Sequence, residues 1–350
     1  MTTALIMTGT GTVVASEIES RGENVLEILQ TGICGTDRHL YQGKLGESEP
    51  FVLGHEVVGI IRKLDNPKTL LGDRVEVGDR VILAPGINCG LCNNCILKKA
   101  FCENRFVYGF TPFSDSKHPE LNGGFAQFLD LKPGSKVFKV KEAIEDDRAI
   151  FTEIIACAVG AVEKITEVKQ LSQIGKCLIL GAGAAGYSNF VTAEHYGLHA
   201  SLADINPEAL RLAEKTGVSR EKLINLAETQ DLSEQFDAVI DCTGHGEAFA
   251  KAIQAAAKGG VVIEFGAFAP TQPVKAFDFW EICRKELTVR GLSETLDRNF
   301  PMALRIVEAT PYRLEQLLTK SFSLADSQAI EQFLASAEAG KGKIVPLSTT

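Results

Sequence analysis

The stretch Lys176-Cys177-Leu178-Ile179-Leu180-Gly181-Ala182-Gly183-Ala184-Ala185-Gly186 decides the fold of the second half of this chain. Its apolar start predicts a buried strand, and the glycine spacing GxGxxG follows at once. In such a turn the first glycine permits a tight bend, the second lets a pyrophosphate approach the backbone, and the third lets the next helix pack against the strand. We therefore predict that a dinucleotide binds where the helix begins, at Gly181, Gly183, Ala184, Ala185 and Gly186.

Strand-like and helix-like segments alternate after this turn. In chain order we expect a helix at 184–197, a strand at 200–204, a helix at 207–216, a strand at 238–241, a helix at 247–257 and a strand at 261–264. This alternation is typical of a parallel, doubly wound sheet with helices on its faces. The predicted class is therefore α/β.

Asp204 ends the second of these strands, about 20 residues after the glycines. A carboxylate at this place binds the ribose hydroxyls of the adenosine and would repel a 2′-phosphate. The next residues, Ile205, Asn206 and Pro207, provide no cation for such a phosphate. NAD is therefore favoured over NADP. The alternative is that Asp204 only caps the following helix, since Asn206-Pro207 is a signal for a helix start.

Residues 1 to about 150 have a different pattern, with short strand-like runs such as 24–29 and 57–61 separated by Gly, Asp and Pro. Such runs predict a compact antiparallel β barrel. A length of 350 residues favours two domains. The last strand-like segment, 343–347, has the composition to return to the first domain.

A candidate metal site comes from two motifs in the first half, Cys34-Gly35-Thr36-Asp37 and Gly54-His55-Glu56, together with Glu153. A thiolate, an imidazole and a carboxylate form a workable catalytic zinc set, because three protein ligands leave the fourth tetrahedral position open. Cys157 follows Glu153 by four residues and would share its helix face, so it is an alternative third ligand.

Four cysteines lie within one short stretch, at Cys89, Cys92, Cys95 and Cys102. Four thiolates close a tetrahedron, which indicates a structural zinc site. The alternative is a set of free thiols. The chain start has no basic segment followed by a long apolar one, so we expect a cytoplasmic protein with reduced cysteines, where a cysteine cluster favours metal over disulfides.

Charge and hydropathy exclude two kinds of partner. The net charge of −9 gives no basic surface for nucleic acid. No apolar run reaches the roughly 20 residues needed to cross a membrane. The expected partner is a small-molecule substrate.

These motifs together give the chain a resemblance to the zinc-dependent medium-chain dehydrogenases/reductases, the alcohol dehydrogenase superfamily, with the polyol and sugar dehydrogenases as the closest branch. They occur in the family's order along the whole chain, and the last of them is Asp241-Cys242-Thr243-Gly244. The resemblance implies a GroES-like β-barrel catalytic domain at 1–154 with a zinc lobe at about 88–103, a Rossmann domain at 155–294, and a segment at 295–350 that returns to the catalytic domain.

The resemblance also implies roles for single residues. Cys34, His55 and Glu153 would hold a catalytic zinc, Asp37 would orient the ring of His55, and Glu56 would lie behind the metal. Thr36 and His39 would relay the proton of the alcohol, and Thr243 and Gly244 would line the nicotinamide. The family is commonly a homodimer or homotetramer, joined through edge strands such as 261–265 and 287–289.

The implied activity is zinc- and NAD-dependent oxidation of a secondary hydroxyl of a polyol, sugar or cyclitol, with hydride transfer to NAD. Glu153 tilts the substrate toward this class because it stands in a stretch similar to that of polyol dehydrogenases. Within enzymes, the alternative is a simple alcohol dehydrogenase or a threonine 3-dehydrogenase type. A non-enzyme alternative is a zinc-stabilised, NAD-binding regulatory protein.

Overall fold

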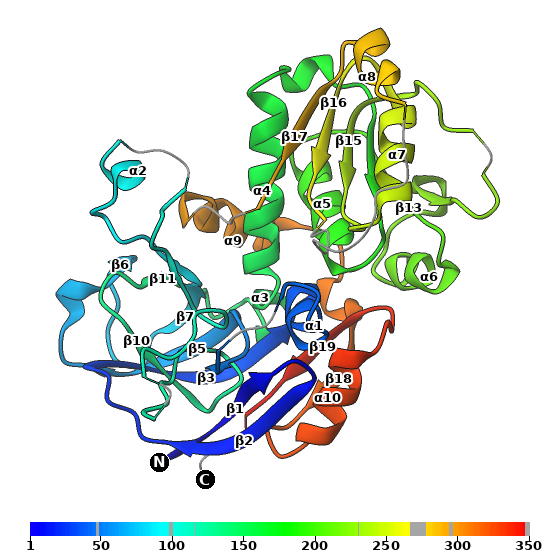
Figure 1. The fold of residues 1–350 in the computed structure, drawn as a ribbon. Helices are drawn as coiled ribbons and strands as arrows, with labels where there is room; N and C mark the ends of the chain where they lie inside the picture. Colours follow the sequence, from blue (N-terminus) through cyan, green and yellow to red (C-terminus); the bar gives the residue numbers. More distant parts are fainter. Residues whose placement is uncertain are drawn as a thin grey trace. The chain divides into compact units, whose positions relative to one another are not determined.

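The computed structural model describes residues 1–46, 49–97, 101–115, 117–229, 231–266, 278–293 and 297–346. Contacts divide the chain into two units, which Figure 1 shows with their elements labelled. The first unit contains 1–153, 320–338 and 342–350, and the second contains 154–319 and 339–341. Within the described ranges, none of the helices is long and apolar enough to cross a membrane.

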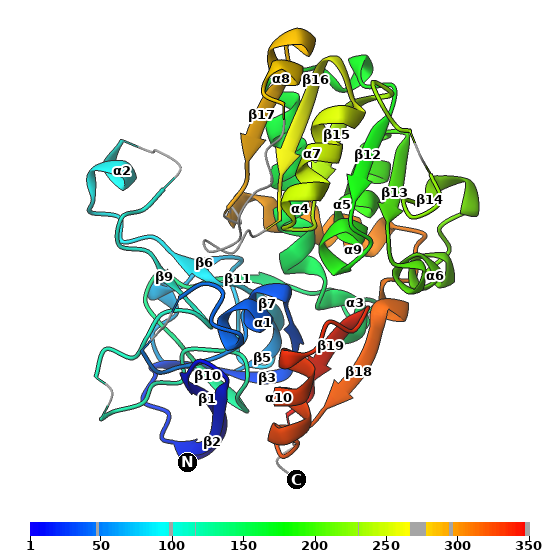
Figure 2. The ribbon, with the colours of Figure 1, turned by 45° about the vertical axis from the view of Figure 1, so that its right-hand side comes forward.

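The second unit is built on a six-stranded parallel sheet, visible in Figure 2. The strand order is β14-β13-β12-β15-β16-β17, so the chain starts in the middle of the sheet and builds outward on both sides. This is the doubly wound order of a dinucleotide-binding sheet, which confirms the predicted fold class. The strands are β12 (Cys177–Leu180), β13 (Ala200–Asp204), β14 (Leu223–Asn225), β15 (Phe236–Asp241), β16 (Ala256–Glu264) and β17 (Thr288–Gly291).

Helices cover this sheet in two sets. The first set, α5 (Ala184–His195) and α6 (Pro207–Lys215), packs near β12, β13 and β14. The second set, α7 (Gly246–Ala255) and α8 (Trp280–Lys285), packs against the other half of the sheet. The expected helices at 184–197, 207–216 and 247–257 are therefore present, each slightly shorter at its carboxyl end.

The first unit is mostly antiparallel, as expected. Its main sheet follows the order β18-β19-β3-β5-β7-β11-β6, and β10 pairs with the first half of β3. The exception is β6, which pairs with β11 in parallel. The strands are β3 (Asn24–Ile33), β5 (Glu56–Leu64), β6 (Leu71–Gly72), β7 (Arg80–Ala84), β10 (Phe128–Leu131), β11 (Lys136–Lys139), β18 (Leu318–Phe322) and β19 (Lys341–Ile344).

A second, three-stranded sheet completes the first unit, with β1 (Thr2–Gly9) between β2 (Thr12–Ile18) and β4 (Phe51–Val52). One continuous core of buried apolar side chains joins both sheets with helix α10 (Ser327–Ala335). The carboxyl-terminal segment therefore contributes both a helix and a strand to this unit.

The return of the chain to the first unit differs from the expectation. It starts at Lys320, and not at residue 295, because α9 (Phe300–Ala309) packs on α5 within the second unit. The expected strand at 343–347 is present as β19, which pairs antiparallel with β3 and ends at Ile344. Leu347, at the end of the expected strand, lies outside the described residues.

Candidate functional site

A largely buried group of possible metal ligands forms where β3 and β5 lie side by side. The register pairs Gly32 with Glu56, so Cys34, two residues after Gly32, lies beside the start of β5. One ligand atom from each of Cys34, His55 and Glu56 lies within 4.8 Å of the other two. His55 and Glu56 are buried. The fold thus brings together two of the three ligands expected from the sequence, and adds Glu56.

Glu153 is not in this group. It is buried at the second position of α4 (Thr152–Thr166), and it is the last residue of the first unit. Cys157 lies one helical turn later, in the second unit. Among the residues that the structure describes, neither of them joins a cluster of three or more metal-ligating side chains. The choice of the third ligand therefore stays open between Glu153, Cys157 and Glu56.

Asp37 contacts both of the grouped ligands from behind. Its Oδ2 accepts a hydrogen bond of 2.7 Å from the backbone N–H of Cys34, and its Oδ1 lies 3.5 Å from Nδ1 of His55. Burial of the ring is the largest single effect and lowers the pKa of His55, but Asp37 and Cys34 together outweigh it, so the net pKa is raised well above its usual value. In zinc sites, the ring nitrogen of a histidine ligand that does not bind the metal usually contacts a carboxylate, which fixes the orientation of the ring. These residues therefore fit zinc.

Thr36 and His39 follow on α1 (Gly35–Tyr41). Oγ1 of Thr36 is 3.7 Å from Sγ of Cys34, so its hydroxyl lies at the ligand group. His39 comes three residues later, on the same side of the helix as Thr36. The ring of Phe110 packs against that of His55, with 4.8 Å between the ring centroids.

The four cysteines of the lobe come together as predicted. Their four Sγ atoms lie within 4.8 Å of one another, around α2 (Asn93–Ile96). Sγ of Cys102 accepts a hydrogen bond from the N–H of Cys89, and backbone N–H groups, that of Leu91 first, lower the pKa of Cys89 to about 6. A thiol that ionises easily suits metal binding. The six residues between Cys95 and Cys102 are thus enough to close the group.

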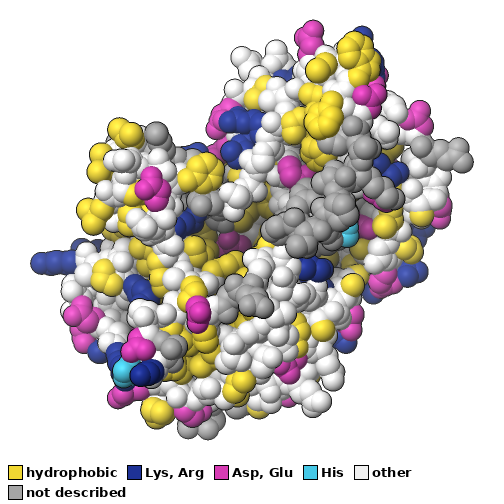
Figure 3. Space-filling model, viewed as in Figure 1, with side chains coloured by type: hydrophobic (Ala, Val, Ile, Leu, Met, Phe, Trp, Pro, Cys, Tyr) yellow, Lys and Arg dark blue, Asp and Glu magenta, His cyan; other side chains and the backbone are white. Residues whose placement is uncertain are grey.

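The surface of this lobe is unusually apolar. Figure 3 shows hydrophobic side chains exposed over the region of α2. Four large side chains contribute, and the most exposed is Leu91 at 84%. They are Leu91, Ile96, Leu97 and Phe101.

The glycine-rich turn has the geometry expected for a phosphate-binding site. Gly181 has a φ of +92°, which favours glycine. A Cβ on Gly186 would lie 1.6 Å from the carbonyl oxygen of Gly181, whereas a Cβ on Gly183 would meet nothing within 4 Å. Gly186 is therefore needed for packing, and Gly183 leaves open space at the start of α5, where a ligand phosphate has room.

Asp204 supports this turn directly. Its Oδ2 accepts a hydrogen bond of 2.6 Å from the N–H of Ala182, and its Oδ1 accepts one of 2.7 Å from the N–H of Asn206. The cap of α6 is Asn206, whose side chain accepts from the N–H of Glu208. The alternative role of Asp204 as the helix cap is therefore wrong.

Thr243 and Gly244 follow β15 at the same edge of the sheet. Asp241, the last residue of β15, accepts hydrogen bonds through Oδ1 from the N–H of Thr243 at 2.9 Å and from its hydroxyl at 2.7 Å. Glu264, the last residue of β16, lies directly beside Asp241 in the register. Neither carboxylate was expected to have a role from the sequence. The signal that could have found them is an acidic residue at the end of two neighbouring apolar strands.

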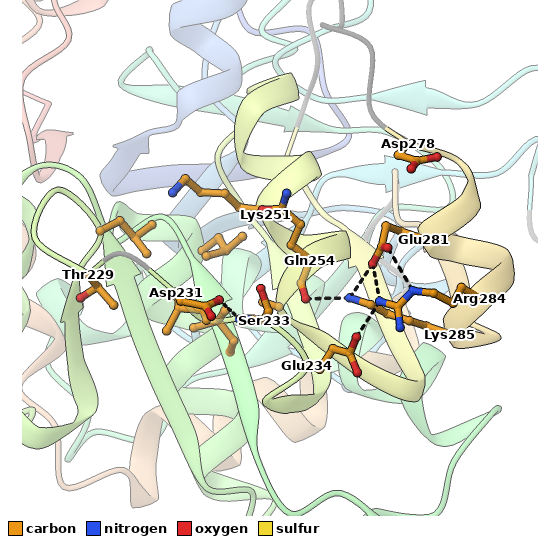
Figure 4. Close-up of a pocket in the computed structure, with 15 residues that line it drawn as sticks. Thr229, Asp231, Ser233, Glu234, Lys251, Gln254, Asp278, Glu281, Arg284 and Lys285 are labelled. Atoms are coloured by element: carbon orange, nitrogen blue, oxygen red, sulfur yellow. Dashed lines mark hydrogen bonds and ion pairs between the residues drawn. The ribbon is translucent and has the colours of Figure 1, made fainter.

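The second unit also contains a cavity of about 490 Å³ between α7, α8 and the segment after β14, drawn in Figure 4. Part of its lining is an ion-pair cluster, in which Arg284 binds both Glu234 and Glu281. Nζ of the buried Lys285 donates to two backbone carbonyls of α7. No residue of the predicted sites lines this cavity, so we assign it no part in catalysis.

Two family models match the chain. Residues 20–142 match the alcohol dehydrogenase GroES-like domain, and residues 174–309 match the zinc-binding dehydrogenase domain. An L-threonine 3-dehydrogenase of Alteromonas mediterranea is 30% identical over 91% of this chain and 90% of its own length. D-arabinitol dehydrogenase 1 of Uromyces fabae is 27% identical over 93% of this chain and 90% of its own length.

Solved structures share the whole fold. An alcohol dehydrogenase of Thermotoga maritima is 26% identical, with a TM-score of 0.84 and 99% of both chains covered. The L-idonate 5-dehydrogenase of Escherichia coli is 22% identical, with a TM-score of 0.81 and 98% of both chains covered. At that identity the second match supports the fold alone.

Proposed function

Since this chain belongs to the zinc-dependent medium-chain dehydrogenase/reductase family, we propose that it oxidises a secondary hydroxyl of a polyol, sugar or cyclitol and passes hydride to NAD. Membership makes the chain an oxidoreductase that acts on CH–OH groups with zinc and a nicotinamide cofactor. The regulatory, non-enzymatic alternative is therefore set aside. The substrate class and the preference for NAD are the parts that we propose.

The observation that carries the proposal is the group formed by the half-buried thiol of Cys34 and the buried imidazole and carboxylate of His55 and Glu56, whose ligand atoms lie within 4.8 Å of one another. When bound, zinc lowers the pKa of a substrate hydroxyl and NAD accepts the hydride. We assign Cys34 and His55 as two zinc ligands, with the third taken from Glu153, Cys157 or Glu56. The lobe cysteines, Cys89, Cys92, Cys95 and Cys102, hold a second, structural zinc.

The proton of the alcohol leaves through side chains of α1. The hydroxyl of Thr36, 3.7 Å from Sγ of Cys34, would accept this proton as it donates its own toward His39. His39 lies three residues further along the helix and carries the proton toward water. Asp37 holds the ring of His55 through Nδ1, which leaves the other ring nitrogen, Nε2, for the metal.

The cofactor binds the turn at 181–186. The open space at Gly183 accepts the pyrophosphate, and Asp204 accepts hydrogen bonds from the ribose hydroxyls through lone pairs that its backbone contacts leave free. The carboxylate also opposes a 2′-phosphate, which supports NAD over NADP. Thr243 and Gly244 line the nicotinamide side.

A second candidate substrate is L-threonine. The relative that is 30% identical to this chain over most of its length is an L-threonine 3-dehydrogenase. Threonine also carries a secondary hydroxyl, so the same residues would perform the same chemistry. What separates the two candidates is recognition of the rest of the substrate.

The test is NADH formation with zinc-loaded protein and a panel of polyols, aldoses, cyclitols, simple alcohols and L-threonine. We expect turnover that a chelator abolishes, with highest kcat/KM for one polyol, sugar or cyclitol. Highest kcat/KM for L-threonine would replace the proposed substrate class with the second candidate. Turnover with NADP alone would contradict the role of Asp204.

We also propose that the chain forms a homodimer or homotetramer through edge strands of the second unit. Of the two expected edge strands, the one at 261–265 overlaps β16, which lies inside the sheet between β15 and β17, so that expectation was wrong. The one at 287–289 overlaps β17, which is at the edge, so its outer side carries backbone groups that a second copy can pair. Light scattering after size-exclusion chromatography tests this, and a monomer at micromolar concentration would contradict it.

A further inference from the structure

Two carboxyl groups lie side by side at the carboxyl edge of the parallel sheet. Asp241 ends β15 and Glu264 ends β16, and the two residues are partners in the register. Val239 and Val262, two residues earlier on each strand, both belong to the apolar core beneath α7. Because side chains alternate along a strand, Asp241 and Glu264 point to that same face of the sheet.

Of the four carboxyl oxygens in this pair, one accepts ordinary hydrogen bonds and three do not. Oδ1 of Asp241 accepts from Thr243. Oδ2 of Asp241 and both carboxyl oxygens of Glu264 are buried and accept no hydrogen bond of normal geometry from the described residues, although the backbone N–H of Gly266 lies close enough to Glu264 to lower its pKa. Two ionised carboxylates in adjacent register positions would repel each other. One proton shared between them removes the repulsion and joins Oδ2 of Asp241 to one oxygen of Glu264 by a hydrogen bond.

The surroundings favour the proton on Glu264. Burial first, and then the charge of Asp241, raise the pKa of Glu264 to about 9. Burial also raises the pKa of Asp241, although Thr243 opposes this by hydrogen bonding. The other titratable groups that act on the pair are His245, at the start of α7, and Cys242, whose thiol is buried.

The pair stands at the junction of two segments. The backbone carbonyl of Asp241 accepts hydrogen bonds from Phe265 at 2.8 Å and from Gly266 at 2.9 Å, and its side chain holds Thr243. Gly266 lies so close to Gly244 that a Cβ on Gly266 would be 2.3 Å from the nitrogen of Gly244. The segments after β15 and β16 are thus fixed to each other at Asp241.

We propose that Glu264 is a positioning residue for the nicotinamide cofactor: as a neutral acid it donates a hydrogen bond to Asp241 and so holds the segment with Thr243 and Gly244 in its binding shape. The inference rests on the proposed function in one respect, that this edge binds NAD. Because the acid form exists below its pKa, tight cofactor binding is present below a pH of about 9 and is lost as the pH rises through that value.

The test is NADH binding, measured by fluorescence titration of the zinc-loaded protein between about pH 7 and about pH 10. For the wild type we expect a Kd that stays level and then rises about tenfold per pH unit above pH 9. Glu264→Gln keeps a donor for Asp241 but does not titrate, so its Kd stays level. Glu264→Ala removes the donor, so its Kd is already raised at pH 7.

Glu221→Gln is the matched control. Glu221 is exposed and lies just before β14, at the opposite edge of the sheet, so this variant keeps the wild-type profile. The same alkaline rise in Glu264→Gln as in the wild type would overturn the inference. Absence of NADH binding by the wild type at pH 7 would instead overturn the proposed function of this edge.

A second measurement covers the case in which Glu264→Gln does not fold. Carbon-13 NMR of wild-type protein labelled at its glutamate carboxyls reports the titration of each group. One glutamate with a pKa near 9 supports the inference. The result that overturns it is that all glutamates titrate below a pH of about 6.

Discussion

The carboxylate of Asp37 lies 3.5 Å from Nδ1 of His55, and both side chains are buried. The same carboxylate holds the backbone N–H of Cys34 at 2.7 Å. One acidic side chain therefore fixes the orientation of two proposed zinc ligands that are 21 positions apart in the sequence.

We predict that Asp37→Asn weakens zinc binding about tenfold or more, because the neutral amide orients His55 less strongly. Competition with a chromophoric chelator measures the affinity. Asp115→Asn is the matched control, since Asp115 makes a similar contact to His118 at 2.7 Å on the exposed surface. Equal zinc affinity in Asp37→Asn and the wild type would show that Asp37 does not support the metal.

Metal analysis separates the two zinc sites. We predict two zinc ions per wild-type chain and one in Cys34→Ser, because the four-cysteine lobe remains intact. Cys89→Ser also loses one ion but retains the catalytic zinc. Cys283→Ser, which changes an exposed cysteine of α8, keeps both and is the control. Two zinc ions in purified Cys34→Ser would refute the catalytic site.

The third ligand is found with three further variants, Glu56→Gln, Glu153→Gln and Cys157→Ser. Only the variant that removes a true ligand lowers the zinc content to that of Cys34→Ser, since a change behind the metal weakens binding less. We predict that Glu153→Gln is this variant. The same loss in Glu56→Gln, with normal zinc in Glu153→Gln, would assign the third position to the carboxylate that already lies in the group.

Substitution of two glycines of the turn by alanine is predicted to affect different properties of the protein. Gly186→Ala places a Cβ 1.6 Å from the carbonyl oxygen of Gly181, so it lowers the free energy of unfolding by about 3 kcal/mol or more. Gly183→Ala meets nothing within 4 Å, so its stability stays within about 1 kcal/mol of the wild type. Gly183→Ala instead weakens NAD binding. Thermal unfolding and NADH titration of both variants check this, and an unchanged NADH affinity in Gly183→Ala would contradict the phosphate site.

Asp204→Asn is predicted to raise the KM for NAD about tenfold, because hydrogen bonds to a charged group contribute about 1.5–3 kcal/mol. The KM for NADP falls relative to that for NAD, since the repulsive charge is lost. Asp231→Asn changes an exposed carboxylate of the same unit and serves as the control. Unchanged cofactor preference in Asp204→Asn would assign selectivity to other residues.

Local patterns were enough to predict most of the sheet of the second unit, although the short edge strand β14 was not predicted. The apolar run before Gly181 and the alternation after it identified β12, β13, α5 and α6. The start of β16 at Ala256, five residues before the expected strand, was not predicted. The alanines and glycines at 256–260 have weak strand propensity. The return at Lys320 was also missed, since it depends on how α9 packs and not on a local signal.

The site could be predicted only for ligands that stand in a recognisable motif. Cys34 and His55 were identified from their motifs, and the pairing of β3 with β5 brings them together. The closeness of Glu56 to both, and the pairing of Asp241 with Glu264, depend on strand register. Register is a relation between distant segments, which one sequence does not reveal.

The most direct test of the central claim is steady-state NADH formation by the zinc-loaded protein with NAD and the substrate panel, beside a chelated sample and Cys34→Ser. We expect turnover of one polyol, sugar or cyclitol, which both chelation and Cys34→Ser abolish. Turnover that persists in Cys34→Ser, or none on any secondary alcohol of the panel while zinc and NADH are both bound, would contradict it.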